Sequence, residues 1–340
     1  MQPAVAHDLA ARRFLPIVKF PLADWIDAHE GCRHNLGESG MAGVVRPVRP
    51  SPAQVRAADP NALRRILADE LDVAPDRLFL THGATEANAW AVHYLARRGR
   101  GGPGAARVRF PEYPPLVDVA RSAGFRLTEA GRRPSVAILS NPRNPEGHRL
   151  AAEDLFRWAD GARDLVVDET FREFARSPTI GDGRPGVWRT GSFTKFFGGD
   201  SLRVGFLVVP EREAAAYARF HGLVVDELAP VAVAGALATW RARDRLRRTV
   251  ERVWLGNRKV WRRAFPDAPP LASSVFFDRP VRPNGRALAE RCLARSVLVC
   301  PGDLFGDPSG VRLGLTRPTF LRDLAAYLRV RDGRTLSGAR

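Results

Sequence analysis

The sequence predicts an α/β protein with a large domain built on a mostly parallel sheet and a smaller α+β domain. Short apolar strands alternate with helices from about residue 59 to residue 210, which is typical of a parallel sheet covered by helices on both faces. The pattern then changes to long helices, and a second strand–helix segment follows. A chain of 340 residues is long enough for both domains.

The elements of the large domain follow from turn residues and apolar runs. Residues 59–71 predict a helix, because Asp59 suits the N-cap and Pro60 suits the first helical position. Strands are predicted at residues 77–80, 107–110, 135–140, 164–169, 186–193 and 203–210. Helices are predicted between them, within residues 81–99, 114–124 and 152–160.

The C-terminal third predicts long helices and then a second sheet. Helices are expected at residues 214–220 and 229–265, and a last helix begins near Thr319. Strands are expected at residues 273–278, 296–300 and 311–316. The predicted division is residues 1–40 as an N-terminal arm and part of the small domain, 41–250 as the large domain, and 251–340 as the small domain.

Composition narrows the class of protein. The net charge of +16 comes from dispersed arginines, with no block of five basic residues and no zinc-finger or RNA-binding motif, so nucleic-acid binding is a remote alternative. No apolar run reaches the length of a membrane span, and no apolar signal segment precedes Arg12. Three scattered cysteines favour a reducing cytoplasm over a disulfide framework or a metal site.

Lysine is rare in this chain, which directs attention to the segment GSFTKFF. Lys19, Lys195 and Lys259 are the only lysines among the 53 basic residues. Lys195 follows a predicted strand and lies between hydroxyl-bearing and aromatic residues. Arginine can supply surface charge, but its guanidinium stays protonated and cannot serve as a nucleophilic amine. The position therefore predicts a catalytic lysine that forms a Schiff base.

Polar residues at the ends of the predicted strands indicate what this lysine binds. Ligands of an open parallel sheet lie beyond the carboxyl ends of its strands. The groups that could bind a phosphate are backbone N–H groups at a helix start, hydroxyls and an arginine: Gly83, Ala84, Thr85, Ser192, Thr194 and Arg203. Asp168 could pair with a cationic ring nitrogen, and Lys195 with an aldehyde. Phosphate, pyridinium and aldehyde are the three functional groups of pyridoxal 5′-phosphate (PLP).

Five motifs in order carry a resemblance to a known family. The segments GATEA, NPRNPEG, VVDE, SFTK and LRVGF resemble those of fold-type I PLP-dependent aminotransferases of class I/II, especially histidinol-phosphate aminotransferase and threonine-phosphate decarboxylase relatives. The resemblance covers residues 35–330 and implies the PLP-dependent transferase fold of type I. It also implies transfer of an amino group between an L-amino acid and a 2-oxo acid, and a homodimer with active sites at the subunit interface.

The resemblance also implies roles for single residues. Lys195 would hold PLP and move the Cα proton, Asp168 would pair with the ring nitrogen, Asn144 would bind the ring's 3′ oxygen, and Tyr113 would stack on the ring. Arg312, in VRLGLT, would bind the substrate carboxylate, and Gly37, in NLGESG, would approach the same carboxylate. The resemblance implies no metal ion.

Departures from the family pattern leave the reaction subtype open. Phe171 stands where relatives often have a tyrosine, Glu146 stands where threonine is usual, and no tyrosine precedes Tyr94. The alternatives are a PLP-dependent decarboxylase, eliminase or oxidase on the same fold. A non-enzymatic nucleic-acid-binding protein is the remote alternative, because the enzyme fold leaves no room for a separate DNA-binding domain.

Overall fold

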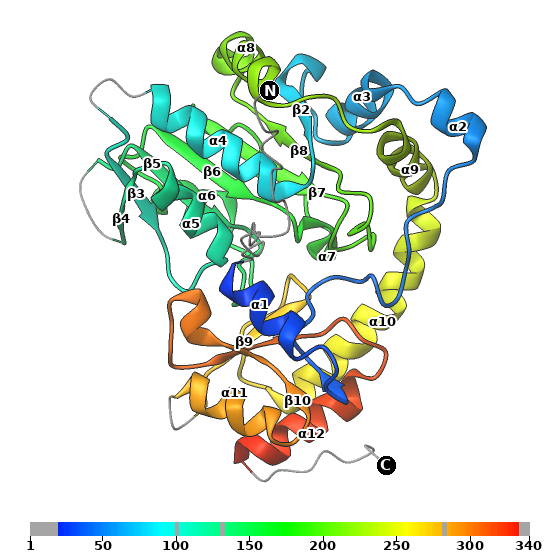
Figure 1. Ribbon diagram of the computed structural model, residues 1–340. Coiled ribbons are helices and arrows are strands. Elements are labelled where there is room, and N and C mark those ends of the chain that lie inside the picture. The colour runs from blue at the N-terminus through cyan, green and yellow to red at the C-terminus, as the bar shows by residue number, and fades with distance from the viewer. Residues whose placement is uncertain (1–19, 99–101, 130–132, 281–283, 333–340) are drawn as a thin grey trace, which may run out of the picture.

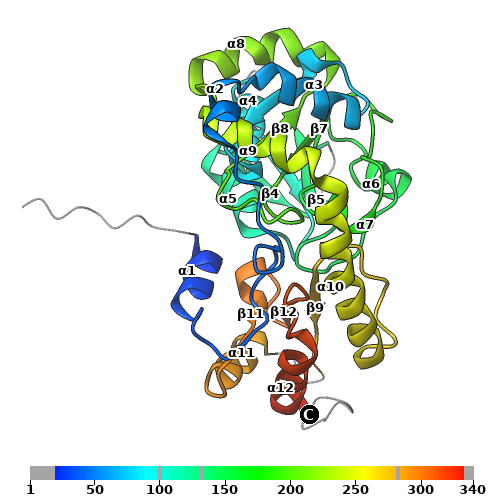
Figure 2. The same cartoon turned by 90° about the vertical axis from the view of Figure 1, so that its right-hand side faces the viewer.

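A computed structural model describes residues 20–98, 102–129, 133–280 and 284–332. The upper part in Figure 1 contains a large twisted sheet with helices around it, and the lower part contains a smaller sheet with its own helices. The long helix α10 (Arg243–Ala264) runs along one side and connects the two parts, as Figure 2 shows from a second direction.

The large sheet has seven strands in the order β2-β8-β7-β6-β5-β3-β4. The five strands from β7 to β4 are parallel, whereas β8 is antiparallel to both of its neighbours. The strands are β2 (Leu78–Thr81), β3 (Ala105–Val108), β4 (Arg126–Thr128), β5 (Val136–Ser140), β6 (Asp164–Asp168), β7 (Val187–Ser192) and β8 (Gly205–Val208). The predicted mostly parallel sheet is confirmed.

The central strands are buried on both faces, which explains their nearly continuous apolar sequences. Alternate residues of β5 face opposite layers: Val136 and Ile138 pack with one helical layer, and Ala137 and Leu139 pack with the other. The first layer contains α4 (Ala84–Arg98), α5 (Pro114–Ser122) and α8 (Ala214–Val224), and the second contains α6 (Ala152–Trp158).

One helix of the expected pattern differs from the structure. The segment 229–265 forms two helices, α9 (Pro230–Arg241) and α10, separated at Ala242. The apolar residues of α9 are buried over most of its length, whereas α10 is amphipathic and carries many charged residues. The break allows each helix to face a different environment.

The small domain is built around the antiparallel sheet β11-β12-β9, formed by β9 (Val275–Asp278), β11 (Cys300–Pro301) and β12 (Val311–Gly314). β1 (His34–Asn35) pairs in parallel with β10 (Val297–Leu298). The segment that precedes the large domain in the chain therefore packs against the C-terminal strands. The remaining α-helices are α1 (Pro21–Ala28), α2 (Pro52–Arg56), α3 (Pro60–Glu70), α7 (Arg172–Ala175), α11 (Gly285–Leu293) and α12 (Phe320–Asp332). Among the described residues, no helix is both long and apolar enough to cross a membrane.

Candidate active site

A pocket of about 230 Å³ lies at the carboxyl ends of the parallel strands β5, β6 and β7. These strands end at Ser140, Asp168 and Ser192, and all three residues line the pocket. The other lining residues come from turns and helix starts: Phe20, Ala84, Thr85, Tyr113, Asn144, Thr170, Phe171, Thr194, Lys195, Asp200 and Arg203. Nine of the predicted site residues therefore meet in one place, although they are far apart in the sequence.

One end of the pocket is formed by the start of α4 and by Arg203. Gly83 has a φ of +94°, and a Cβ atom there would lie 3.0 Å from Nη2 of Arg203. Gly205 on β8 packs so closely that its own Cβ would lie 2.4 Å from the carbonyl carbon of Gly83. The first-turn N–H groups of α4 lack acceptors within the helix, and together with a guanidinium they form an anion site.

Asp168 is buried and has hydrogen-bond donors on both of its carboxylate oxygens. Asn88 Nδ2 donates to Oδ2 at 2.8 Å, and the backbone N–H of Thr170 donates to Oδ1 at 2.9 Å. Thr190 Oγ1 in turn donates to Asn88 Oδ1 at 2.7 Å, which fixes the amide orientation. Among the described residues, no cationic side chain lies within ion-pair distance of Asp168, so its carboxylate can accept a cation from a ligand.

Lys195 lies in the turn after β7, next to the segment that contains Gly40. A Cβ atom on Gly40 would lie 3.5 Å from Cδ of Lys195, and the backbone N–H of Met41 donates to the Lys195 carbonyl at 2.8 Å. Burial lowers the pKa of Lys195, while the negative charge of Asp200 opposes that shift. A lowered pKa increases the fraction of neutral amine at neutral pH, which is the form that acts as a nucleophile.

Tyr113 and Asn144 border the pocket from two adjacent loops. Tyr113 is half-buried and meets Phe20 edge-on, with ring centroids 6.1 Å apart. Burial and the charge of Asp168 raise the pKa of Tyr113 to about 12. Asn144 is buried, and its side-chain oxygen has no hydrogen-bond partner among the described residues. A buried amide with an unused polar atom facing a pocket is expected to bind a ligand atom.

A buried ion pair holds these two loops together. Arg143 and Glu112 are both fully buried and form an ion pair. Glu112 also accepts hydrogen bonds from the backbone N–H of Tyr113 at 2.7 Å and of Ser140 at 2.9 Å. The Ser140 hydroxyl in turn accepts from the N–H of Asn144 at 2.9 Å. Burial raises the pKa of Glu112, and the Arg143 guanidinium opposes that rise.

We expect Arg143→Met to lower the free energy of unfolding by about 3–5 kcal/mol, because it leaves the buried Glu112 carboxylate unpaired. Urea denaturation measures the change. The double variant with Glu112→Gln is expected to lose less than the single variant, since no charge is then left alone. A loss below about 1 kcal/mol in the single variant would show that the pair contributes little to stability.

Arg312 reaches the same region from β12 of the small domain. Its side chain is buried, Nη2 donates to the carbonyl oxygen of Gly37 and lies 3.3 Å from Sγ of Cys300, and Nε has no partner. Within the described part of the chain, no carboxylate lies within ion-pair distance of Arg312. A buried guanidinium without a counterion is costly, so this arrangement fits an anionic ligand. The predicted neighbours Arg312 and Gly37 are in contact.

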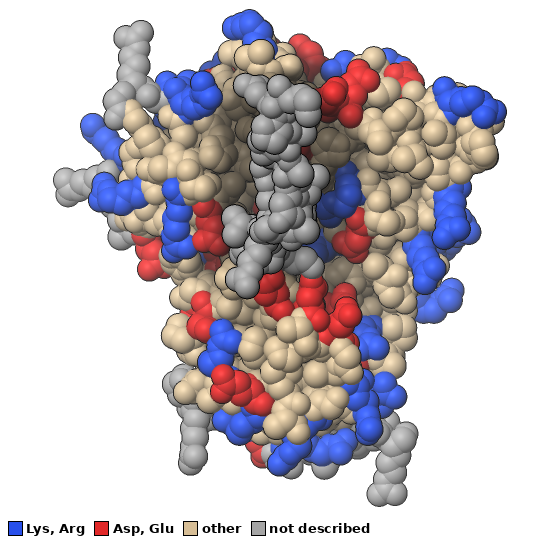
Figure 3. Space-filling model, in the orientation of Figure 1, with Lys and Arg blue, Asp and Glu red and all other residues tan. Residues whose placement is uncertain are grey.

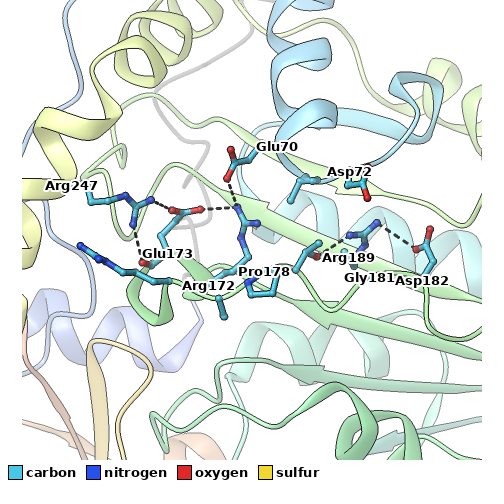
Figure 4. A pocket seen from close by; sticks show the side chains of 13 residues that line it. Glu70, Asp72, Arg172, Glu173, Pro178, Gly181, Asp182, Arg189 and Arg247 are labelled. Carbon is cyan, nitrogen blue, oxygen red and sulfur yellow. Dashed lines mark hydrogen bonds and ion pairs between the residues drawn. The ribbon is translucent and has the colours of Figure 1, made fainter.

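A larger hollow of about 820 Å³, which Lys195 does not line, lies between the end of α3, α7, α10 and Arg189 on β7 (Figure 4). Its arginines have carboxylate partners within the described part of the chain. Arg247 pairs with Glu173, Arg172 pairs with Glu173, Arg189 pairs with Asp182, and Arg176 pairs with Glu251. The charges in this hollow therefore compensate one another, unlike those of the smaller pocket.

Several residues of the pocket were not predicted. Phe20, Thr170 and Asp200 line it, and Asn88, Glu112 and Arg143 hold its lining residues in place. The sequence contains one signal for Asp200, because this residue lies between Lys195 and Arg203, two of the predicted site residues. The other contacts join residues distant in sequence and have no local pattern.

The fold and the unpaired charges define an α/β protein with a preformed site for a small ligand that carries several charges. A family profile described as aminotransferase class I and II matches residues 122–325. Threonine-phosphate decarboxylase of Pseudomonas aeruginosa (strain PAO1) is 27% identical over 338 residues, with 90% of each chain covered. Histidinol-phosphate aminotransferase of Halorubrum lacusprofundi is 26% identical over 330 residues, with 85% of this chain and 87% of that protein covered.

A crystal structure of an aminotransferase from Mycobacterium tuberculosis superimposes with a TM-score of 0.72 at 20% sequence identity, covering 93% of this chain and 96% of that one. Because the family profile spans more than half of the chain, this protein belongs to aminotransferase class I and II. Enzymes of this family depend on pyridoxal phosphate. The predictions of the family, the fold and the cofactor are confirmed, and the residue assignments remain predictions.

Proposed function

We propose that this protein transfers an amino group between an L-amino acid and a 2-oxo acid at the pocket around Lys195. The observation that supports the site most directly is the convergence of Asp168, Arg203 and Arg312, three charged side chains that lack an opposite charge among the described residues. PLP and an amino-acid carboxylate together carry the three complementary charges.

The residues of the pocket fit the cofactor group by group. Arg203, the start of α4 and the hydroxyls of Ser192 and Thr194 would hold its phosphate, and Asp168 would hold its protonated ring nitrogen. Tyr113 would cover a ring face, and the side-chain N–H of Asn144 would donate to the ring oxygen. When bound, PLP supplies an aldehyde that condenses with amines and a ring that accepts electrons.

Lys195 and Arg312 would handle the substrate. Arg312 would bind the α-carboxylate with its planar guanidinium, next to Gly37, whose carbonyl oxygen accepts from its Nη2. Lys195 Nζ would take the proton from the substrate Cα and deliver it to C4′ of the cofactor. Its lowered pKa makes the neutral amine available as a base. Asn88 and Thr190 act through Asp168 by keeping its carboxylate in place.

We also propose a homodimer in the cytoplasm, with residues 41–250 as the large domain and 251–340 as the small domain. Leu223 and Val231 support the dimer, since these apolar side chains are 85% and 56% exposed and a second copy would cover them. All three cysteines are free thiols, in keeping with a reducing compartment. The boundary at residue 250 falls within α10, and part of the proposed arm, residues 1–19, lies outside the described residues.

Reductive trapping tests the proposed site. Borohydride treatment of the yellow holoenzyme is expected to fix the cofactor on the peptide that contains Lys195, as read by mass spectrometry. Incubation with individual L-amino acids and 2-oxoglutarate is then expected to release glutamate and a new 2-oxo acid. Label on Lys259 alone, or a protein that takes up no cofactor, would contradict the proposal.

A second candidate function is decarboxylation on the same site, because one of the relatives is named a threonine-phosphate decarboxylase. The two reactions differ in which bond to Cα is broken, and their products differ accordingly. Measurement of released CO₂ against the 2-oxo acid formed, in the same reaction mixture, distinguishes them.

Phe171 gives a test of how the ring oxygen is held. It is buried and lines the pocket together with Asn144. In Phe171→Tyr a phenol hydroxyl would join Asn144 as a donor toward that oxygen, and bonds to the ionised oxygen weaken its hold on the proton shared with Lys195 Nζ. We expect the visible absorption band of this variant to titrate at a lower pH than that of the unchanged protein. An equal or higher midpoint would mean that residue 171 does not face the ring oxygen.

A further inference from the structure

We propose that Asp200, together with Glu38, binds a positively charged group on the substrate side chain, so that the preferred amino acids carry an ammonium or guanidinium group beyond Cα. The inference rests on the proposed function, because it assigns the substrate class of the same pocket. It is carried by the position of Asp200, by its lack of partners and by the charge balance of the site.

Asp200 lies at the mouth of the pocket, since it lines the pocket and is also exposed to solvent. A Cβ atom on Gly40 would lie 3.5 Å from Cδ of Lys195 and 3.7 Å from Oδ2 of Asp200. The carboxylate and the lysine stem therefore flank the same glycine. Glu38 precedes Gly40 by two residues, and its charge acts on Lys195 in the same sense as that of Asp200.

Neither carboxylate has a partner within the described part of the chain. No hydrogen bond and no ion pair within 4 Å joins Asp200 or Glu38 to another described residue. In the larger hollow, by contrast, Glu173 is paired with Arg247. Although the chain has a net charge of +16, Asp200 lines the pocket with no cationic partner among the described residues.

With PLP and substrate bound, the charged groups of the pocket pair with one another, and these two carboxylates remain without a counterion. Arg203 is used by the phosphate, Asp168 by the ring nitrogen and Arg312 by the substrate carboxylate. Lys195 is the remaining cation in the pocket, and its amine is neutral when it acts as a base. Asp200, which lines the pocket, and Glu38, two residues before Gly40, then have no counterion, which favours a cation on the substrate side chain and disfavours a phosphate or second carboxylate.

A second feature, apart from the carboxylates, supports the reading of the pocket lined by Asp200 as a ligand site. Asn144, which lines the same pocket, is buried with an unused side-chain oxygen. On the face shown in Figure 3, Lys and Arg lie mainly along the outer edges, whereas Asp and Glu gather near the middle, between the two domains.

Ligand binding to the holoenzyme tests the proposal without turnover. The probes are 4-guanidinobutanoate and 6-methylheptanoate, which share a carboxylate and a similar shape but differ in the charge of the distal group. Calorimetry gives the ratio of the dissociation constant of the neutral ligand to that of the cationic ligand. We expect Asp200→Asn to lower this ratio about tenfold, the effect of one charge-assisted contact. Glu153→Gln on α6 is the matched control, because it removes the same charge from an exposed position, and its ratio should not change.

Substrate preference gives a second measurement. The ratio of kcat/KM for L-ornithine to that for L-norvaline is expected to fall in Asp200→Asn and in Glu38→Gln, and to stay constant in Glu153→Gln. Thermal unfolding and size-exclusion chromatography show whether the variants are folded and dimeric. Unchanged ratios in both measurements would overturn the proposal, and dissociation of the dimer with unchanged ratios would assign Asp200 to a subunit contact instead.

Failure of this substrate class and failure of the proposed function would give different results. If the enzyme transferred amino groups from neutral amino acids and Asp200→Asn did not change the two ratios, the proposed function would be supported and the proposed substrate class would be wrong. An altered ligand preference in a protein that performs no amino transfer would support the assignment of Asp200 and contradict the proposed function.

Discussion

Lys195→Ala is expected to lower kcat about 10⁴-fold, because proton transfer by a positioned side chain contributes up to about that factor. The variant should still take up PLP, since the start of α4 is on a different element from the lysine, and Arg203, eight residues after Lys195 in the same connection, keeps its side chain. Phosphate analysis after dialysis measures retention of the cofactor. Single-turnover kinetics with an amino acid measures the loss of proton transfer.

Lys259→Ala is the matched control for this result. Lys259 is on α10, is exposed and does not line the pocket, so its replacement removes the same side chain without touching the site. Its kcat should equal that of the unchanged protein. If both variants lost activity equally, or if Lys195→Ala retained more than about a tenth of it, the assignment of Lys195 as the proton-transferring base would be wrong.

Arg312→Lys is expected to lower kcat/KM for amino acids by about 30- to 700-fold, corresponding to about 2–4 kcal/mol for a buried charge pair that loses its bidentate geometry. The physical reason is that an ammonium cannot present two parallel N–H groups to a carboxylate. The buried carbonyl of Gly37, which accepts from Nη2, would also lose its present partner.

An amine that lacks the carboxylate separates binding from folding in this experiment. L-norvaline and n-butylamine differ only in that group, so the reaction of n-butylamine with the holoenzyme should be nearly the same in both proteins. Stopped-flow absorbance follows both compounds. Equal losses for the two would show that Arg312 supports the structure of the small domain and does not bind the substrate.

The sequence by itself determined the central features of this protein. Apolar strands followed by polar residues place Asp168, Ser192 and Lys195 at one edge of the sheet, because the carboxyl ends of parallel strands lie at the same edge. A rare lysine among fifty arginines indicated the proposed reactive amine. These signals are local or follow from strand order, so they can be read along the chain.

Tertiary structure decided what holds and completes the site. Asn88 bonds Asp168 across 80 positions, Arg312 meets Gly37 across 275, and Arg143 reaches Glu112 across 31. No periodicity encodes such pairs, because each depends on how two separately formed elements pack. The same holds for Asp200, whose importance depends on the absence of a partner. Whether a charge is compensated is a property of the surrounding space, and only the folded chain defines that space.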